Sequence, residues 1–201
     1  MASPFVPATS TIDELRAAAA GCRGCDLYKN ATQTVFGAGP PDARVVLIGE
    51  QPGDIEDRRG LPFVGPAGKV LDRAIVDAGL DRAGAYVTNV VKHFKFKSTG
   101  PGKRRIHQTP ERVEIEACRP WLDAEFSLLR PEIVVALGAT AAKALIGPSF
   151  RVTRQRGEIM PWRDTRILAT IHPSAVLRAD DREEAYNGLV TDLTVAAAAL
   201  Q

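Results

Sequence analysis

The sequence lacks the features that mark membrane and secreted proteins. No apolar run approaches the roughly 20 residues that a membrane-spanning helix requires. No basic segment followed by an apolar stretch opens the chain, as a secretion signal would. Only 3 of the 201 residues are cysteine, so a disulfide-rich secreted scaffold is excluded. We therefore expect a cytoplasmic protein in a reducing compartment, with no membrane partner.

A large excess of charge of one sign is also missing. The net charge of +2 is too small for a protein that coats nucleic acid over its whole surface. With 45% hydrophobic and 25% charged residues, the composition is that of an ordinary globular domain. We expect a single domain over residues 1–201, with a loose tail at residues 1–10, in a monomeric protein.

The cations gather instead in residues 92–105, which include no acidic residue. The most basic part is the run Lys103-Arg104-Arg105, and His107 follows it closely. Three consecutive cations cannot be buried in a hydrophobic core, so these side chains must face solvent or a polyanion. A histidine delivered by such a segment can act as a nucleophile, base or ligand beside a phosphate-bearing substrate. A solvated basic turn is the alternative.

Four short apolar runs have the composition of buried parallel strands, and helical stretches separate them. This alternation predicts a three-layer α/β/α sandwich around a central, mainly parallel four-stranded sheet. Ligands of such sheets bind outside the carboxyl ends of the strands, and each strand here ends in a polar or glycine-containing turn. The strands are expected at residues 44–49, 85–89, 132–138 and 166–170, and the helices at 67–78, 110–129, 139–146 and 182–199.

The cysteines have the spacing of metal ligands. Cys22 and Cys25 are separated by two residues, which lets both thiolates bind one metal centre, and Cys118 lies far along the chain. His93 is the best candidate for a fourth ligand. Three thiolates and an imidazole suit tetrahedral zinc at least as well as an iron–sulfur cluster. A buried Cys118 that packs as a small hydrophobic residue is the alternative to both.

Taken together, these motifs resemble those of the uracil-DNA glycosylase superfamily. The resemblance runs from Cys22 to the last helix and rests on the sequences GEQPG, LPFVGPAG, TNVVK and HPS, at residues 49–53, 61–68, 88–92 and 172–174. The cysteine pair and the later run Cys118-Arg119-Pro120 resemble the iron–sulfur-containing type-4 branch. Three departures from the usual type-4 pattern are similar to the UdgX subgroup, which stays covalently attached to uracil-DNA: Gln51, His93 and the inserted Lys103–His107 (KRRIH).

The resemblance implies a cofactor and a substrate. The cofactor would be a [4Fe–4S] cluster rather than zinc, and the substrate would be uracil-containing DNA, single-stranded DNA included. The implied cluster ligands are Cys22, Cys25, His93 and Cys118.

The resemblance also implies roles for the side chains at the strand ends. Phe63 would stack on the uracil ring, Asn89 would pair with the uracil edge, and His172 would hydrogen-bond a uracil carbonyl and steady the departing anion. The alternative for Phe63 is an aromatic residue of the core, and for Asn89 a turn residue at the strand end. The alternative for His172 is a histidine that satisfies the turn before Pro173.

Cleavage of the N-glycosidic bond leaves positive charge at C1′ of the deoxyribose. The resemblance implies that His107 captures this carbon in place of water, and that Glu50 accepts the imidazole proton. Gln51 would position the sugar or compete with the water. The DNA-binding residues would be Lys103, Arg104, Arg105, Ser174 and Arg178.

The function expected from the sequence is therefore single-turnover uracil excision with covalent trapping of the abasic sugar through His107. Three alternatives stay open. The first is a conventional multiple-turnover type-4 uracil-DNA glycosylase, in which His107 only contacts DNA. The others are a non-catalytic DNA-binding iron–sulfur module and a zinc-stabilised nucleotide-binding protein.

Overall fold

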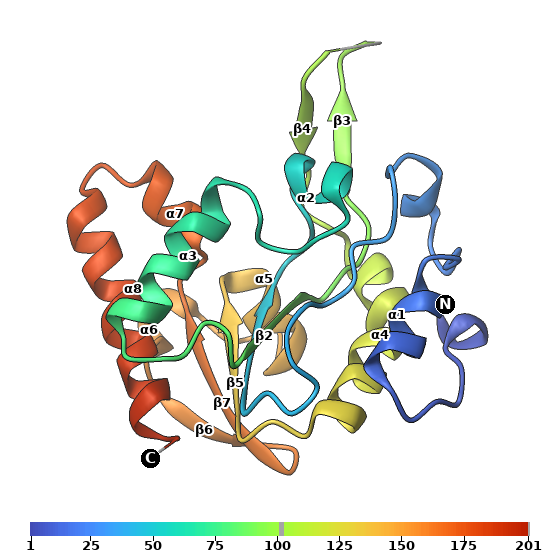
Figure 1. Cartoon of the computed structure of the whole chain (residues 1–201). Helices are drawn as coiled ribbons and strands as arrows, with labels where there is room; N and C mark the ends of the chain where they lie inside the picture. The colour runs from blue at the N-terminus through green and yellow to red at the C-terminus, as the bar shows by residue number, and fades with distance from the viewer. Residues whose placement is uncertain (101–102, 201) are drawn as a thin grey trace.

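A five-stranded sheet forms the middle layer of the computed structural model, which describes residues 1–100 and 103–200 (Figure 1). Four of the strands are parallel, and the edge strand β6 runs antiparallel to β7. The order across the sheet is β2 (Ala85–Asn89), β1 (Val45–Gly49), β5 (Ile133–Leu137), β7 (Thr165–Thr170) and β6 (Ile159–Trp162).

Alternate residues of each inner strand face two separate hydrophobic layers. Val46 and Ile48 of β1 pack in one layer with the helices α1 (Ile12–Ala19), α4 (Arg112–Leu129) and α5 (Ala139–Leu145). Val45 and Leu47 pack in the other with α3 (Pro66–Asp77), α7 (Pro173–Arg178) and α8 (Arg182–Ala198). All five residues of β1, and all five of β2 and β5, are buried. Both faces of the sheet are therefore covered, which explains why these strands are continuous apolar runs.

The helices flank the sheet on both sides (Figure 1). The four helices predicted between and after the strands are confirmed to within two residues at each end. The short helices α2, α6 and α7 were not predicted. Among the described residues the α-helices are α1 (Ile12–Ala19), α2 (Asp54–Arg59), α3 (Pro66–Asp77), α4 (Arg112–Leu129), α5 (Ala139–Leu145), α6 (Val152–Gln155), α7 (Pro173–Arg178) and α8 (Arg182–Ala198). None of them combines the length and apolarity needed to cross a bilayer.

The predicted α/β architecture with a mainly parallel sheet is confirmed, but the prediction of four strands is wrong. The fifth strand, β6, contains Pro161, which pairs in register with Arg166 of β7. A proline reads as a strand breaker because it has no N–H to donate. At the edge of a sheet that loss is tolerated, so the sequence signal was misleading here.

The basic segment forms a hairpin that projects from the edge of the domain (Figure 1). Its strands are β3 (Phe96–Ser98) and β4 (Arg105–His107), which pair antiparallel in a small sheet of their own. Pro101 and Gly102 of this segment lie outside the described residues. His107 stands opposite Phe96 at the base of the hairpin.

The prediction of a loose tail at residues 1–10 is wrong for its first half. Ala2 is only 1% exposed, and its N–H donates to the carbonyl of Ala117 in α4 at 2.8 Å. The amino group of Met1 donates to the carbonyl of Gly24 at 2.6 Å. A short 3-10 helix, Ser3–Phe5, follows. A segment of about five residues is too short to show a periodic pattern. Its packing against the domain could therefore not be predicted from the sequence.

Candidate active site

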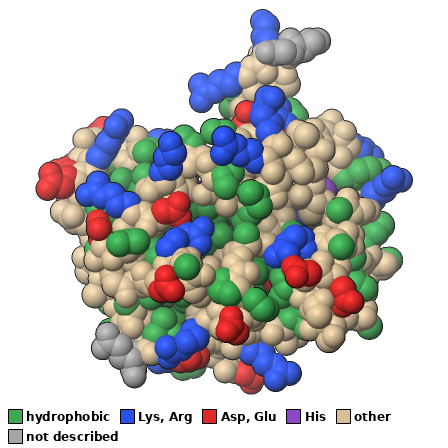
Figure 2. Space-filling view, in the orientation of Figure 1, with side chains coloured by type: hydrophobic (Ala, Val, Ile, Leu, Met, Phe, Trp, Pro, Cys, Tyr) green, Lys and Arg blue, Asp and Glu red, His purple; other side chains and the backbone are tan. Residues whose placement is uncertain are grey.

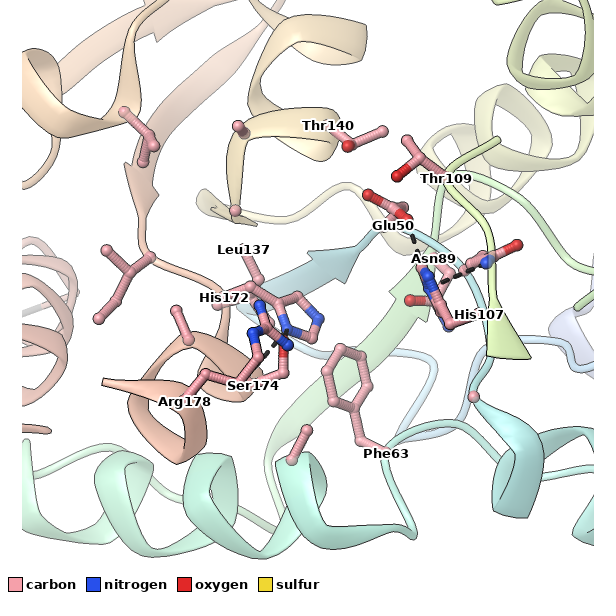
Figure 3. Close-up of a pocket in the computed structure, with 18 of the residues that line it drawn as sticks. Glu50, Phe63, Asn89, His107, Thr109, Leu137, Thr140, His172, Ser174 and Arg178 are labelled. Carbon is pink, nitrogen blue, oxygen red and sulfur yellow. Dashed lines mark hydrogen bonds and ion pairs between the residues drawn. The ribbon is translucent and has the colours of Figure 1, made fainter. Parts of the chain in front are cut away.

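A cavity of about 680 Å³ opens at the carboxyl ends of the parallel strands (Figure 3). This is the edge of the sheet at which the strand-end turns were expected to converge. Loops after β1, β2, β5 and β7 line it, together with helix α7 and the base of the hairpin. The structure brings together here eight of the residues that the sequence singled out: Glu50, Gln51, Phe63, Asn89, His107, His172, Ser174 and Arg178.

The absence of a side chain at Gly49 lets the Asn89 and Phe63 side chains, which line the cavity, lie close to the end of β1. A Cβ at that position would lie 2.5 Å from Asn89 Oδ1 and 2.7 Å from Phe63 Cζ. The Phe63 ring stacks beside the His172 ring, with centroids 6.1 Å apart and an angle of 30° between the planes. Figure 3 shows the Phe63 and His172 side chains facing the same space. An aromatic face, a side-chain amide and an imidazole therefore surround a gap for a flat polar ring.

Phe63 is held in a left-handed backbone conformation, with a φ of 54°. Two features support this loop. Gly68 lets helix α3 approach, because a Cβ there would overlap the Phe63 carbonyl. The Gly65 N–H donates to the buried carboxylate of Glu56 at 2.7 Å. Glu56 was not predicted from the sequence. A buried carboxylate needs a hydrogen-bond donor, and here the backbone of the glycine-rich loop provides it.

His172 is placed as a neutral hydrogen-bond donor. Its Nδ1 accepts the Ser174 N–H at 3.1 Å, at the first turn of α7, so the ring proton of the neutral form lies on Nε2. Burial, helped by the nearby charge of Arg178, lowers the pKa of His172 to about 4. The ring is therefore uncharged near neutral pH and can donate Nε2–H to an oxygen that gains negative charge.

Gln51 contacts His107 at the base of the hairpin. The Lys95 N–H donates to Gln51 Oε1 at 2.8 Å, which identifies the opposite end of the amide as the donor. That Nε2 lies 2.9 Å from His107 Nε2 and also contacts the carbonyls of Gln108, at 2.9 Å, and Lys95, at 3.2 Å. The amide nitrogen has two protons for these three acceptors, and when it donates to His107 Nε2 the lone pair of that nitrogen points at Gln51.

A carboxylate stands beside the same nitrogen. Glu50 Oε1 lies 3.4 Å from His107 Nε2. Within the described part of the chain, this buried oxygen has no hydrogen-bond partner. Unsatisfied buried oxygens are rare and call for a functional explanation. An unpaired negative charge at this point can offset positive charge that develops on an imidazole or on a neighbouring sugar.

Arg105 anchors the hairpin that carries His107. Its guanidinium pairs with Asp54 and, at 2.6 Å, with Asp57 of helix α2, and it lies over the rings of Phe94 and Phe96. The Arg105 side chain is only 12% exposed. The resemblance placed this residue among the DNA contacts, and in the structure its charge is paired within the protein, which favours a positioning role for it.

Three of the other predicted DNA contacts, Lys103, Arg104 and Arg178, are exposed, and Ser174 is half-buried. Lys103 and Arg104 lie at the outer part of the hairpin, and Arg178 lies at the end of α7 on the rim of the cavity. Figure 2 shows Lys and Arg side chains on the projecting hairpin and along the edge of the molecule on which it stands. The local clustering of cations therefore coincides with the face that bears the cavity.

The three thiols lie near one another, where the N-terminal segment packs against helix α4. Cys22 Sγ accepts Trp121 Nε1–H at 3.1 Å, and Cys118 Sγ accepts the Lys92 N–H at 3.3 Å. Burial is the main cause that raises the pKa of Cys118 to about 12, and the nearby Cys25 and Cys22 contribute. A buried thiol with such a high pKa becomes a thiolate when a metal centre binds it.

The side-chain positions of the described residues do not confirm the predicted metal centre. The described residues include no group of three or more His, Cys, Asp or Glu side chains placed to hold one metal ion. In a [4Fe–4S] cluster each thiolate binds a different iron, so the ligands stand further apart, and N–H donors to the sulfurs are usual. His93 is buried, but its Nε2 pairs with the Thr34 hydroxyl at 3.0 Å and not with a thiol.

The chain is similar in sequence to proteins of one known superfamily. The sequence pattern of the uracil DNA glycosylase superfamily matches residues 36–194, a range that includes every strand named above. The chain is 37% identical to the type-4 uracil-DNA glycosylase of Thermotoga maritima over 164 residues, or 81% of each chain. It is 34% identical to that of Archaeoglobus fulgidus over 184 residues, or 88% of each chain. A type-5 uracil-DNA glycosylase of Thermus thermophilus is 36% identical over 128 residues, covering 56% of this chain and 53% of the relative.

Proposed function

The chain belongs to the uracil DNA glycosylase superfamily, and we propose that it excises uracil from DNA and then retains the abasic deoxyribose covalently through His107. The substrate is uracil-containing DNA, single strands included, and the protein acts as a monomer. One observation carries the proposal beyond the family: the imidazole of His107 lines the cavity, with its Nε2 2.9 Å from Gln51 Nε2 and 3.4 Å from Glu50 Oε1.

Recognition begins with a uracil rotated out of the DNA, because the glycosidic bond of a stacked base cannot be reached. The ring enters the gap at Gly49 and stacks on Phe63. The Asn89 amide offers both a donor and an acceptor to the uracil edge. Cytosine presents the opposite polarity there, and a buried polar group left without its partner strongly disfavours the wrong base.

The bond between C1′ and uracil N1 then breaks, and its electron pair leaves with the base. The uracil carbonyl gains negative charge, which the Nε2–H of neutral His172 stabilises. The sugar gains positive charge, which the unpaired Glu50 carboxylate offsets from its position beside His107.

His107 Nε2 captures C1′ before water does, once it has given up its contact with Gln51. A tethered nucleophile has an effective concentration far above that of a diffusing one, and the ion pairs of Arg105 hold the hairpin in place for the reaction. Glu50, whose Oε1 lies 3.4 Å from Nε2, stabilises the positive charge of the sugar and the ring. The Nδ1 proton of the alkylated ring passes to solvent, because the His107 side chain is 49% exposed.

The relatives named above favour a second candidate, conventional type-4 excision with multiple turnovers. One gel separates the two. Protein is mixed with a uracil-containing single-stranded oligonucleotide, heated in SDS and run under denaturing conditions. A retarded band supports covalent trapping, and abasic product in excess of the protein supports conventional turnover. Intact oligonucleotide contradicts both.

The proposal includes a [4Fe–4S] cluster held by Cys22, Cys25 and Cys118, with His93 as the fourth ligand. When bound, the cluster would tie the N-terminal segment, helix α4 and the loop after β2 to one another, which is a structural role.

We expect Cys118→Ala to lose the brown absorbance and bound iron of protein purified without oxygen, and to melt at a lower temperature. Iron analysis and absorbance spectra check this, with His93→Ala as the test of the fourth ligand. A colourless wild-type protein that carries zinc would contradict the cluster.

The exposed cations of the hairpin are expected to contribute salt-dependent binding. In a His107→Ala background, which prevents trapping, Lys103→Ala with Arg104→Ala should weaken binding to a uracil oligonucleotide. On single-stranded DNA, the slope of log K against log salt should fall by about 0.7 for each phosphate that the protein no longer neutralises. Fluorescence anisotropy at several salt concentrations measures this slope. Arg105→Met is the control, because a guanidinium that is paired with Asp54 and Asp57 releases no counterion. An equal change of slope in both variants would argue against the anchoring role.

A further inference from the structure

An ion pair lies in the core beside the proposed site, outside the roles described so far. Lys92 follows the end of β2, Glu125 belongs to helix α4, and the side chains of both are only 1% exposed. Removing two charges from water is unfavourable, and apolar replacements of such pairs are often neutral or stabilising. Stability alone therefore does not account for this pair.

The Lys92 ammonium has three N–H donors, and each has an acceptor. One proton goes to the Glu125 carboxylate, one to Thr88 Oγ1 at 2.6 Å, and one to the main-chain oxygen of Asn89 at 2.9 Å. The Glu125 carboxylate in turn accepts the Tyr86 hydroxyl at 2.9 Å. Such a fully satisfied network holds its members in one arrangement.

The chain leaves room for this network. A Cβ at Gly37 would overlap both the Tyr86 hydroxyl and Glu125 Oε1. The Lys92 Nζ also lies 5.3 Å from the centre of the Phe36 ring. The surroundings of the pair are therefore apolar on one side and hydrogen-bonded on the other, and little water competes for its contacts.

The contact with Asn89 connects the pair to base recognition. Asn89 is the last residue of β2 and stands in register with Gly49. Lys92 reaches back across the turn that follows and holds the Asn89 carbonyl from below, while the Asn89 side chain lines the cavity above. Fixing the carbonyl fixes the peptide plane, and with it the direction in which the amide leaves the backbone.

We propose that the buried Lys92–Glu125 pair positions the Asn89 amide and thereby sets the preference for uracil over cytosine. Lys92 and Glu125 are positioning residues, since neither reaches the cavity. The inference rests on the proposed excision of uracil and adds a determinant of its specificity. Without the pair, the strand end relaxes and the Asn89 amide no longer meets the pyrimidine edge at hydrogen-bond distance.

The test replaces both charges at once, so that no unpaired charge stays buried. We expect Lys92→Met with Glu125→Met to fold, because the replacements are apolar and of similar volume. Its single-turnover rate of uracil excision, measured with protein in excess, should fall about 10- to 100-fold, as for a misplaced reactive group. The ratio of uracil to cytosine excision should fall as well. The main-chain N–H of Lys92 still reaches Cys118 in this variant, so the thiol site stays unchanged.

Tyr86→Phe is the matched control. It removes a hydrogen bond of Glu125 in the same buried network but leaves the contact between Lys92 and Asn89, so excision should stay near the wild-type rate. If the double variant melts early, Lys92→Gln with Glu125→Gln serves in its place, because it removes both charges and keeps polar groups for the neighbouring hydrogen bonds. It should show a smaller loss with the same dependence on Asn89.

A double-mutant cycle with Asn89→Ala separates positioning from a general structural effect. If the pair acts through Asn89, its removal should add little to the loss caused by Asn89→Ala. An equal fold-loss in the Asn89→Ala background, or an unchanged uracil-to-cytosine ratio with Asn89 intact, would overturn the inference. Wild-type protein that leaves uracil-DNA intact would overturn the proposed function, which is a different result from either.

Discussion

His107→Ala should abolish the SDS-resistant adduct while uracil excision continues. The residues that bind and release the base, Phe63, Asn89 and His172, come from other elements of the fold and keep their places. Water then captures C1′, and one protein molecule can process several oligonucleotides. We expect the retarded band to fall by at least about 100-fold, the scale of advantage that a tethered nucleophile holds. Denaturing gels, with alkaline cleavage of the abasic product, measure both outcomes.

The matched control for this variant is Ile106→Ala. Side chains alternate along a strand, so Ile106 points away from the side shared by Arg105 and His107, and it is 48% exposed. Its removal should leave the adduct intact. A persistent band in His107→Ala would show that another group attacks the sugar, and the trapping proposal in its present form would be lost.

Gly49→Ala is expected to stop uracil excision almost completely. The added methyl group would lie 2.5 Å from Asn89 Oδ1 and 2.7 Å from Phe63 Cζ, inside contact distance of the two side chains that are proposed to hold the base. Neither can move away without leaving its position at the pyrimidine ring. A misplacement of this size is expected to lower the excision rate about 100-fold or more. Single-turnover kinetics and binding of a uracil oligonucleotide measure the effect.

Gly21→Ala provides the comparison, because a Cβ there would meet nothing nearer than the Ala18 carbonyl oxygen at 3.7 Å. It should excise uracil at the wild-type rate. Circular dichroism and thermal melting establish that the Gly49→Ala variant is folded. Normal excision by a folded Gly49→Ala protein would mean that the base binds elsewhere in the cavity.

Much of the sheet could be predicted because its strands are buried on both faces. Such strands are unbroken apolar runs, and the polar residues directly after them come together at one edge of a parallel sheet. Asn89 and His172 were placed in this way from sequence alone, with β2 and β7 as their supports. The position of these residues follows from the local sequence, because parallel strands all end at the same edge of the sheet.

The rest depends on contacts between distant parts of the chain, which no local pattern encodes. The sequence left open whether Asp54 and Asp57 pair with the basic segment or are solvated, and the structure identifies Arg105, about fifty residues later, as their partner. The edge strand β6 was missed because Pro161 suggests a break. Lys92 is recognisable in the sequence as a charged residue at the end of an apolar run. No sequence pattern indicates that its partner is Glu125, which lies in helix α4.

The hairpin β3–β4 stands apart from the central sheet. It forms a small sheet of its own and is fastened to α2 by side chains, so the central sheet does not depend on it. In the proposed mechanism, base removal and sugar capture therefore reside in separable parts. A protein with the same sheet but without the hairpin and its two acidic anchors would be expected to excise uracil and to release its product.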